Sequence, residues 1–158
     1  ASGSLTLSLD PMRNRYLSYG AMVVPSNDAF LGNESPTIIE LFDANGDFIA
    51  QNFAILGSQI WDAGTEVNQL LGAAYIVGED ASAGVTENGM VQLADLSQQF
   101  SAYVGSAVPS GGTFQSAPSA TAPLAAFSFA VVPEPAALSL AAVSVAVVSA
   151  RRRSRRRD

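Results

Sequence analysis

The sequence predicts an all-β fold, an antiparallel β-sandwich followed by a single C-terminal transmembrane helix. Three observations predict this class: short stretches with alternating apolar and polar residues, clusters of Gly, Pro, Asn and Asp between them, and an uncharged apolar segment ahead of a run of arginines. We place the sandwich domain in residues 1–130 and the membrane-associated segment in residues 131–158.

The strands are predicted from short-range patterns. Residues 4–9 alternate apolar and polar side chains, which is typical of a strand with one buried face. Asn45-Gly46 lies between two apolar runs and predicts a hairpin, because both residues of such a turn need positive φ angles. We expect strands at residues 4–9, 16–24, 37–42, 48–55, 57–61 and 124–132, with 57–61 at a sheet edge.

The remaining segments have weaker signals. Residues 67–74 show some helical spacing, and residues 86–90 contain turn-forming residues. Residues 106–123 are rich in Ser, Gly, Pro, Ala and Thr, which indicates a loop or linker.

Composition excludes several classes of site. The chain contains no cysteine and no histidine, so disulfides, thiolate nucleophiles and Ser-His or Cys-His hydrolase pairs are excluded. Residues 1–150 carry 2 arginines against 13 acidic residues, a net charge of −11. Such an acidic body repels nucleic acid, so we expect no nucleic-acid partner, whereas a divalent cation would suit it.

The last residues combine three features in a fixed order. Val132-Pro133-Glu134-Pro135 precedes the uncharged segment 136–150, which would span about 22 Å as a helix, short of the roughly 30 Å hydrocarbon core of a bilayer. A basic tail at 151–158 follows and favours a cytoplasmic end by the positive-inside rule. Its arginines are Arg151, Arg152, Arg153, Arg155, Arg156 and Arg157.

This arrangement, residues 131–158, resembles the PEP-CTERM sorting signal of bacteria that make exopolysaccharide. The resemblance implies that an exosortase recognises the Pro-Glu-Pro motif. It also implies export, a precursor anchored in the inner membrane, and a final place at the cell surface or in the extracellular matrix. The alternative is a plain C-terminal anchor with a stop-transfer cluster.

Two further motifs share a second resemblance. Residues 19–32 read YGAMVVPSNDAFLG and residues 61–66 read WDAGTE, with the predicted hairpin between them. Both resemble segments of spondin domains, in the same order. The resemblance implies an extracellular β-sandwich that binds calcium at one edge and acts in adhesion. Animal spondin domains have additional sequence before the first motif, so we expect this domain to be N-terminally incomplete.

The spondin resemblance implies a calcium site formed by Asp28, Asp62 and Glu66, where Glu66 replaces the usual aspartate. The chemistry agrees, since calcium takes 6–8 oxygen ligands and neutralises carboxylates that would otherwise repel each other. The small residues at 63–65 would let the loop curl around an ion. The weaker candidate ligands are Asn27, Asn33 and Thr65.

Two alternatives concern other residues. Residues 43–47 look like the start of an EF-hand loop, but that loop needs Gly at its sixth position and Glu at its twelfth, where this chain has Phe48 and Ala54. We therefore favour a hairpin turn. Phe30, Trp61 and Tyr103 could stack on a ligand, but we favour a place in the core or its rim.

The sequence thus predicts a calcium-binding adhesion-type module that is not an enzyme. Its expected partners are an exosortase and the inner membrane through the tail, and an exopolysaccharide or a surface protein through the body. Calcium would be structural or ligand-bridging. One alternative is an exported glycan-active enzyme with a carboxylate pair drawn from Asp28, Asp62 and Glu66. Another is an envelope protein whose body has no binding role.

Overall fold

A computed structural model describes residues 2–95 and 97–132 of the chain. It divides the chain into two units, Leu9–Phe129 and a second unit that combines residues 1–8 with 130–158. The described parts of the second unit, 2–8 and 130–132, have no regular secondary structure. The predicted motif residues Pro133, Glu134 and Pro135, the segment 136–150 and the basic tail lie outside the described residues.

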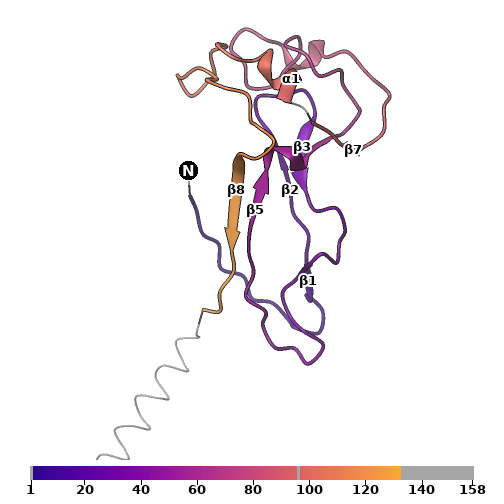
Figure 1. The fold of residues 1–158 in the computed structure, drawn as a ribbon, viewed down its shortest axis with the longest axis vertical. Helices are drawn as coiled ribbons and strands as arrows, with labels where there is room; N and C mark the ends of the chain where they lie inside the picture. The colour runs from indigo at the N-terminus through magenta and orange to yellow at the C-terminus, as the bar shows by residue number, and fades with distance from the viewer. Residues whose placement is uncertain (1, 96, 133–158) are drawn as a thin grey trace, which may run out of the picture. The chain divides into compact units, whose positions relative to one another are not determined.

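The unit Leu9–Phe129 consists mainly of short antiparallel strands (Figure 1). The all-β prediction is therefore confirmed. The strands form three small sheets with the orders β1-β4, β2-β3-β6-β7 and β5-β8. Within residues 2–95 and 97–132, no helix has the length and apolar character needed to cross a membrane. The strands are β1 (Tyr16–Leu17), β2 (Gly20–Met22), β3 (Ala29–Gly32), β4 (Ile39–Glu40), β5 (Asn52–Leu56), β6 (Ile60–Asp62), β7 (Gln92–Leu93) and β8 (Pro123–Ser128), and the short helices are η1 (Gly57–Gln59), η2 (Ala81–Ala83) and α1 (Ser97–Ser101).

The four-stranded sheet pairs a strand of segment 19–32 with the strand that begins segment 61–66. In the pairing of β3 with β6, Phe30 lies opposite Trp61 and Ala29 lies opposite Asp62. Strand β6 also pairs with β7, so it is an interior strand, and the prediction of an edge strand at 57–61 was wrong. Residues 57–59 form η1 instead of extending the strand.

The strand prediction at 124–132 is confirmed in part, because β8 covers Pro123–Ser128. It pairs with β5, and Phe53 stacks on its partner Phe127 with ring centroids 5.1 Å apart. Figure 1 shows β5 and β8 running alongside each other although they are far apart in the sequence. The segment 106–123 is largely irregular, as predicted, with one isolated bridge between Ala107 and Thr113.

Three other local predictions were wrong. Residues 4–9 are exposed and unpaired rather than a strand, because alternation marks a face but does not supply a neighbouring strand. The stretch 16–24 is divided into β1 and β2, which belong to different sheets. Residues 67–74 contain no helix and consist of bends, turns and extended chain.

Of the predicted hairpin at 37–55, only the turn region is formed, and the two flanking strands do not pair with each other. Phe42 bridges Phe48, while β4 pairs with β1 and β5 pairs with β8. Of the two turn residues Asn45 and Gly46, only Gly46 has a positive φ angle, of 86°. Asp43 accepts hydrogen bonds from the backbone N–H groups of Asn45 and Asp47 and so fixes a wider turn. These bonds lower the pKa of Asp43, as expected for a turn-forming carboxylate.

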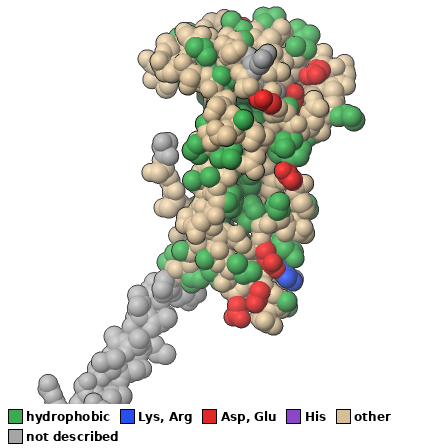
Figure 2. Space-filling model, in the orientation of Figure 1, with side chains coloured by type: hydrophobic (Ala, Val, Ile, Leu, Met, Phe, Trp, Pro, Cys, Tyr) green, Lys and Arg blue, Asp and Glu red, His purple; other side chains and the backbone are tan. Residues whose placement is uncertain are grey.

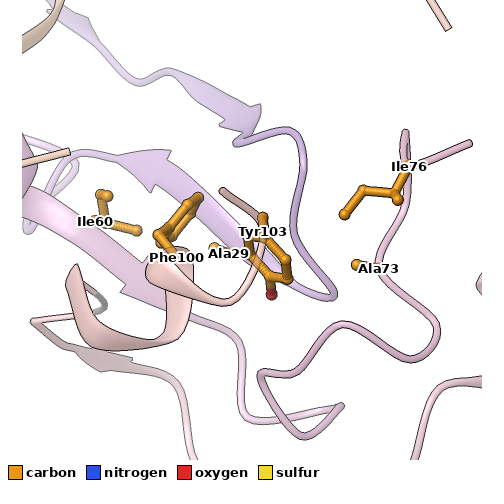
Figure 3. Close-up of a cluster of buried hydrophobic side chains, with 6 residues drawn as sticks. All are labelled: Ala29, Ile60, Ala73, Ile76, Phe100 and Tyr103. Carbon is orange, nitrogen blue, oxygen red and sulfur yellow. The ribbon is translucent and has the colours of Figure 1, made fainter. Parts of the chain in front are cut away.

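A cluster of buried apolar side chains lies between the four-stranded sheet and the loops at one end of this unit (Figures 1 and 3). Tyr103 is fully buried, which confirms its predicted place in the core. Phe30 and Trp61 are only partly buried and stack on each other, with centroids 6.3 Å apart. The cluster comprises Ala29, Ile60, Ala73, Ile76, Phe100 and Tyr103.

Candidate metal centre

The turn between β2 and β3 holds Asp28 in position. Ser26 is fully buried, and its hydroxyl donates to the carbonyl of Val23 and accepts from the N–H of Ala29 at 3.2 Å. The N–H of Val23 also donates to the carbonyl of Ala29 at 2.9 Å. These bonds close the turn tightly, so the carboxylate of Asp28 projects from a rigid base.

The two oxygens of Asp28 differ in their environment. Oδ2 accepts three hydrogen bonds, from the N–H of Thr65 at 2.7 Å, the hydroxyl of Thr65 at 2.8 Å and the N–H of Glu66 at 2.9 Å. Oδ1 is buried and has no hydrogen-bond partner in the described part of the chain. Because a buried oxygen without a donor is costly, Oδ1 is the atom that most needs a further partner.

Asp62 lies at the end of β6, opposite the residue that follows Asp28. It is only 5% exposed, and its oxygens accept from the N–H of Gly64 at 2.8 Å and from the side-chain amide of Asn68 at 2.9 Å. Gly64 has a φ angle of 67° and the backbone of Gly89 lies close to it, so this loop depends on glycine there. The small residues after Asp62 let the loop curl back so that the N–H of Gly64 bonds to the carboxylate.

Glu66 contacts Asp28 through its backbone and not through its carboxylate. Its N–H bonds to Asp28, and the residue forms an isolated bridge with Thr86. Its carboxylate lies against Gly84, because a Cβ atom added to Gly84 would be 2.4 Å from Oε2 of Glu66. Among residues 2–95 and 97–132, no three acidic side chains are grouped closely enough to hold a metal ion.

Asn27 has a structural position next to the site. It is buried, its Oδ1 accepts from the N–H of Gln69 and from the hydroxyl of Tyr103, both at 3.0 Å, and its Nδ2 donates to the carbonyl of Leu71 at 3.0 Å. Asn27 therefore ties three loops together, and both polar atoms of its side chain are already hydrogen-bonded.

Tyr103 lies next to the candidate site and bonds to Asn27, a contact that the sequence analysis did not predict. Burial, together with the negative charge of Asp28 nearby, raises the pKa of Tyr103 to about 12, and an interaction with the Asn27 backbone opposes the rise. Its bond to Asn27 spans 76 positions of the chain, so no local pattern could have indicated it.

The two other weaker candidates have different roles. Thr65 donates its hydroxyl to Asp28, as described above. Asn33 is engaged elsewhere, because its Oδ1 accepts from the N–H of Tyr19 at 3.1 Å and its Nδ2 donates to the carbonyl of Ser35 at 2.6 Å. We therefore do not include Asn33 in the candidate site.

The chain matches no protein-family model, no curated protein and no solved structure in comparisons with each. The candidate site is thus defined by its own geometry. Asp28 immediately precedes β3, and Asp62 ends β6, which pairs with β3. One oxygen of Asp28 is buried without a partner among the described residues, and the backbone N–H of Glu66 bonds to Asp28. Oxygen donors of this kind fit a hard cation such as Ca²⁺.

Proposed function

We propose that this protein is an exported, non-enzymatic surface protein whose body is a calcium-binding adhesion-type module. Residues 131–158 form its exosortase sorting signal. The calcium site consists of Asp28, Asp62 and Glu66. The observation that carries the proposal is the buried Oδ1 of Asp28, which has no hydrogen-bond partner among the described residues.

A cation would satisfy this oxygen better than a protein donor would. Three donors bond to Oδ2 of Asp28, whereas Oδ1 has none among the described residues. The negative charge of the carboxylate is therefore only partly compensated. A divalent ion at Oδ1 would complete the compensation and would also attract the buried carboxylate of Asp62. Calcium accepts irregular shells of carboxylates, carbonyls and water, whereas Mg²⁺ demands a tight octahedron.

Glu66 would supply the third carboxylate. Its backbone is already bonded to Asp28, so only its side chain has to turn from Gly84 towards the ion. In the absence of calcium, repulsion between carboxylates favours keeping Glu66 apart from the others. Calcium binding would then move the Glu66 carboxylate away from Gly84 and towards Asp28 and Asp62.

The setting at the cell surface is supported by the sequence. The order of Pro-Glu-Pro motif, apolar segment and arginines indicates sorting, and the absence of cysteine leaves the body without disulfide stabilisation. A structural cation is one way to stabilise such a small β-rich body. Figure 2 shows acidic side chains on the visible face of the body, in keeping with its negative charge.

Thermal unfolding of the full chain tests the calcium site. Calcium at about a hundredfold excess over its Kd would stabilise the folded state by roughly 2.7 kcal/mol, so Tm should rise by several degrees, with a smaller rise for magnesium and reversal by a chelator. Asp62→Asn and Asp28→Asn should each lose most of this increment. The matched control is Asp43→Asn, because Asp43 is also a turn-forming carboxylate but lies in the 43–47 turn, where it should leave the increment unchanged. A full calcium increment in both site variants would refute the site.

A further inference from the structure

A pocket of about 230 Å³ lies apart from the candidate metal centre. Three aromatic side chains, Tyr19, Phe53 and Trp61, line it. Glu34, Gln51 and Gln59 are among its polar lining residues. None of Asp28, Asp62 and Glu66 contributes to it. Because successive residues of a strand face opposite sides, Trp61 and Asp62 of β6 point to different sides of the sheet.

The aromatic walls are held in fixed orientations. The indole N–H of Trp61 donates to the carbonyl of Gly32 at 3.0 Å, and its ring stacks on Phe30. Phe53 packs against Tyr19, with centroids 6.1 Å apart, and stacks on Phe127, whose ring centroid lies 5.4 Å from that of Tyr19. Rings that are already fixed lose little conformational entropy when a ligand binds, which favours even a weak contact.

The polar groups of the pocket have bonding capacity left. Gln51 donates its Nε2 to the carbonyl of Glu40, so its Oε1 can still accept. Gln59 accepts at Oε1 from the N–H of Leu56, so its Nε2 can still donate. Glu34 is exposed and adds a carboxylate. The pocket therefore offers both acceptors and a donor beside flat apolar surfaces, a combination that suits a ligand with several hydroxyl groups.

We propose that this pocket binds one ring of a neutral oligosaccharide. The faces of aromatic rings are negative and attract the weakly positive C–H face of a sugar, while the amides and the carboxylate bond its hydroxyls. The only charged side chain of the lining is that of Glu34, so acidic sugars are repelled. The volume is below the roughly 300–1,000 Å³ typical of pockets for drug-sized ligands, which fits a single ring.

The geometry also favours binding over cleavage. Glycoside hydrolysis usually needs two carboxyl groups on either side of the bond, and the lining of this pocket contains one, Glu34. The inference rests on the proposed function in one respect, since it names the ligand class of the adhesion module. It uses different residues, however, so the calcium site and the sugar pocket can fail separately.

Trp61 is the sole tryptophan of the chain and lies in the pocket wall, so its fluorescence reports binding directly. The full chain is titrated with neutral trimers of glucose, mannose, galactose and N-acetylglucosamine, and with a trimer of galacturonic acid. At least one neutral trimer should shift the emission saturably with a Kd near or below about 1 mM, and the acidic trimer should bind at least about tenfold more weakly. No saturable shift with any neutral trimer, or equal binding of the acidic trimer, would overturn the proposal.

Two variants test the location of the site. Phe53→Leu keeps apolar bulk but removes the flat ring, and should weaken neutral-trimer binding about tenfold. Its control is Phe48→Leu, at a partly buried phenylalanine that packs on Phe42 in the 41–49 tip outside the pocket. Glu34 is exposed, so Glu34→Gln should leave the fold intact. It should reduce the ratio of the Kd values for the acidic and neutral trimers severalfold. Parent-like binding in Phe53→Leu, or an unchanged ratio in Glu34→Gln, would contradict the assignment.

The calcium experiment separates this proposal from the one above. If Asp62→Asn loses the calcium increment and still binds the neutral trimer, both proposals stand as independent sites. If calcium has no effect and the trimer binds, the sugar pocket stands without the metal centre. If calcium stabilises the chain and no trimer binds, the sugar pocket alone is refuted.

Discussion

Asp28 and Thr65 lie 37 positions apart in the chain and are joined by two hydrogen bonds to one carboxylate oxygen, from the N–H and from the hydroxyl of Thr65. This contact links the turn before β3 to the loop after β6. It gives Asp28 a structural role that does not depend on any bound ion, and that role can be measured separately.

Asp28→Ala should therefore destabilise the protein even without calcium. The change leaves two backbone N–H groups and one hydroxyl without their charged acceptor, and we expect a loss of about 2–4 kcal/mol in the free energy of unfolding. Denaturant unfolding in the presence of a chelator measures it. Asp47→Ala, at an exposed carboxylate in the 43–47 turn, is the control and should change stability by no more than about 0.5 kcal/mol. Equal losses in the two variants would show that the Asp28 contacts contribute nothing.

The raised pKa of Tyr103 predicts that the folded protein loses stability at alkaline pH. Its folded-state pKa of about 12 lies above the usual value of 10, so the folded state keeps the proton longer than the unfolded state does. The resulting stability is fully present below pH 10 and is lost as the pH rises through 12. Absorbance titration of the phenols, compared between the parent and Tyr103→Phe, should show one late-titrating group that is missing in the variant. A difference curve centred near the usual tyrosine pKa would contradict this assignment.

The close contact at Gly57 predicts that adding a single methyl group there strongly destabilises the fold. A Cβ atom at this position would be 2.0 Å from the carbonyl oxygen of Ser119, and the N–H of Gly57 bonds the carbonyl of Ala122 at 2.9 Å. Gly57→Ala should thus push the segment before β8 away and cost about 2–3 kcal/mol. Gly20→Ala in β2, where nothing lies within 4 Å of the added atom, should change stability by no more than about 0.5 kcal/mol. Similar Tm values for the two variants would be incompatible with this packing.

The sorting proposal predicts a defect in processing without a defect in export. Replacing Pro133, Glu134 and Pro135 with alanine removes the motif but leaves the apolar segment and the arginines in place. Mass spectrometry of the surface fraction should then find the uncleaved precursor in place of a trimmed form. Normal trimming of the variant would mean that the segment serves only as an anchor.

Much of the local structure could be predicted from the sequence, but the pairing of strands could not. The alternation in 4–9 predicted a strand with one buried face, and both parts were wrong, since these residues are exposed and pairing depends on a second segment that the pattern does not identify. Asn45-Gly46 marked a turn correctly, but Asp43 decided its type by bonding two backbone N–H groups. The stacking of Phe53 on Phe127 joins segments too distant for any local rule.

The relation between Asp28 and Asp62 follows from the pairing of β3, which begins just after Asp28, with β6, which ends at Asp62. The register that sets Ala29 against Asp62 also brings Asp28 near the loop after β6. The position of the Glu66 carboxylate was not predictable, because it depends on Gly84 in a separate loop. Tyr103 was predicted as a core residue only, since its hydrogen bond to Asn27 depends on the packing of α1 and the turn that follows it.

The pairing of β5 with β8 also sets the order in which the body can mature. If the proposed export begins at the N-terminus, β5 emerges well before β8, and its pairing edge stays open to incorrect partners during that interval. Only when Ser128 has left the exporting membrane can Phe127 reach Phe53 and close the sheet. Because β8 ends just ahead of the Val-Pro-Glu-Pro segment, such an export would reach the proposed sorting residues at nearly the moment when the body becomes able to finish folding.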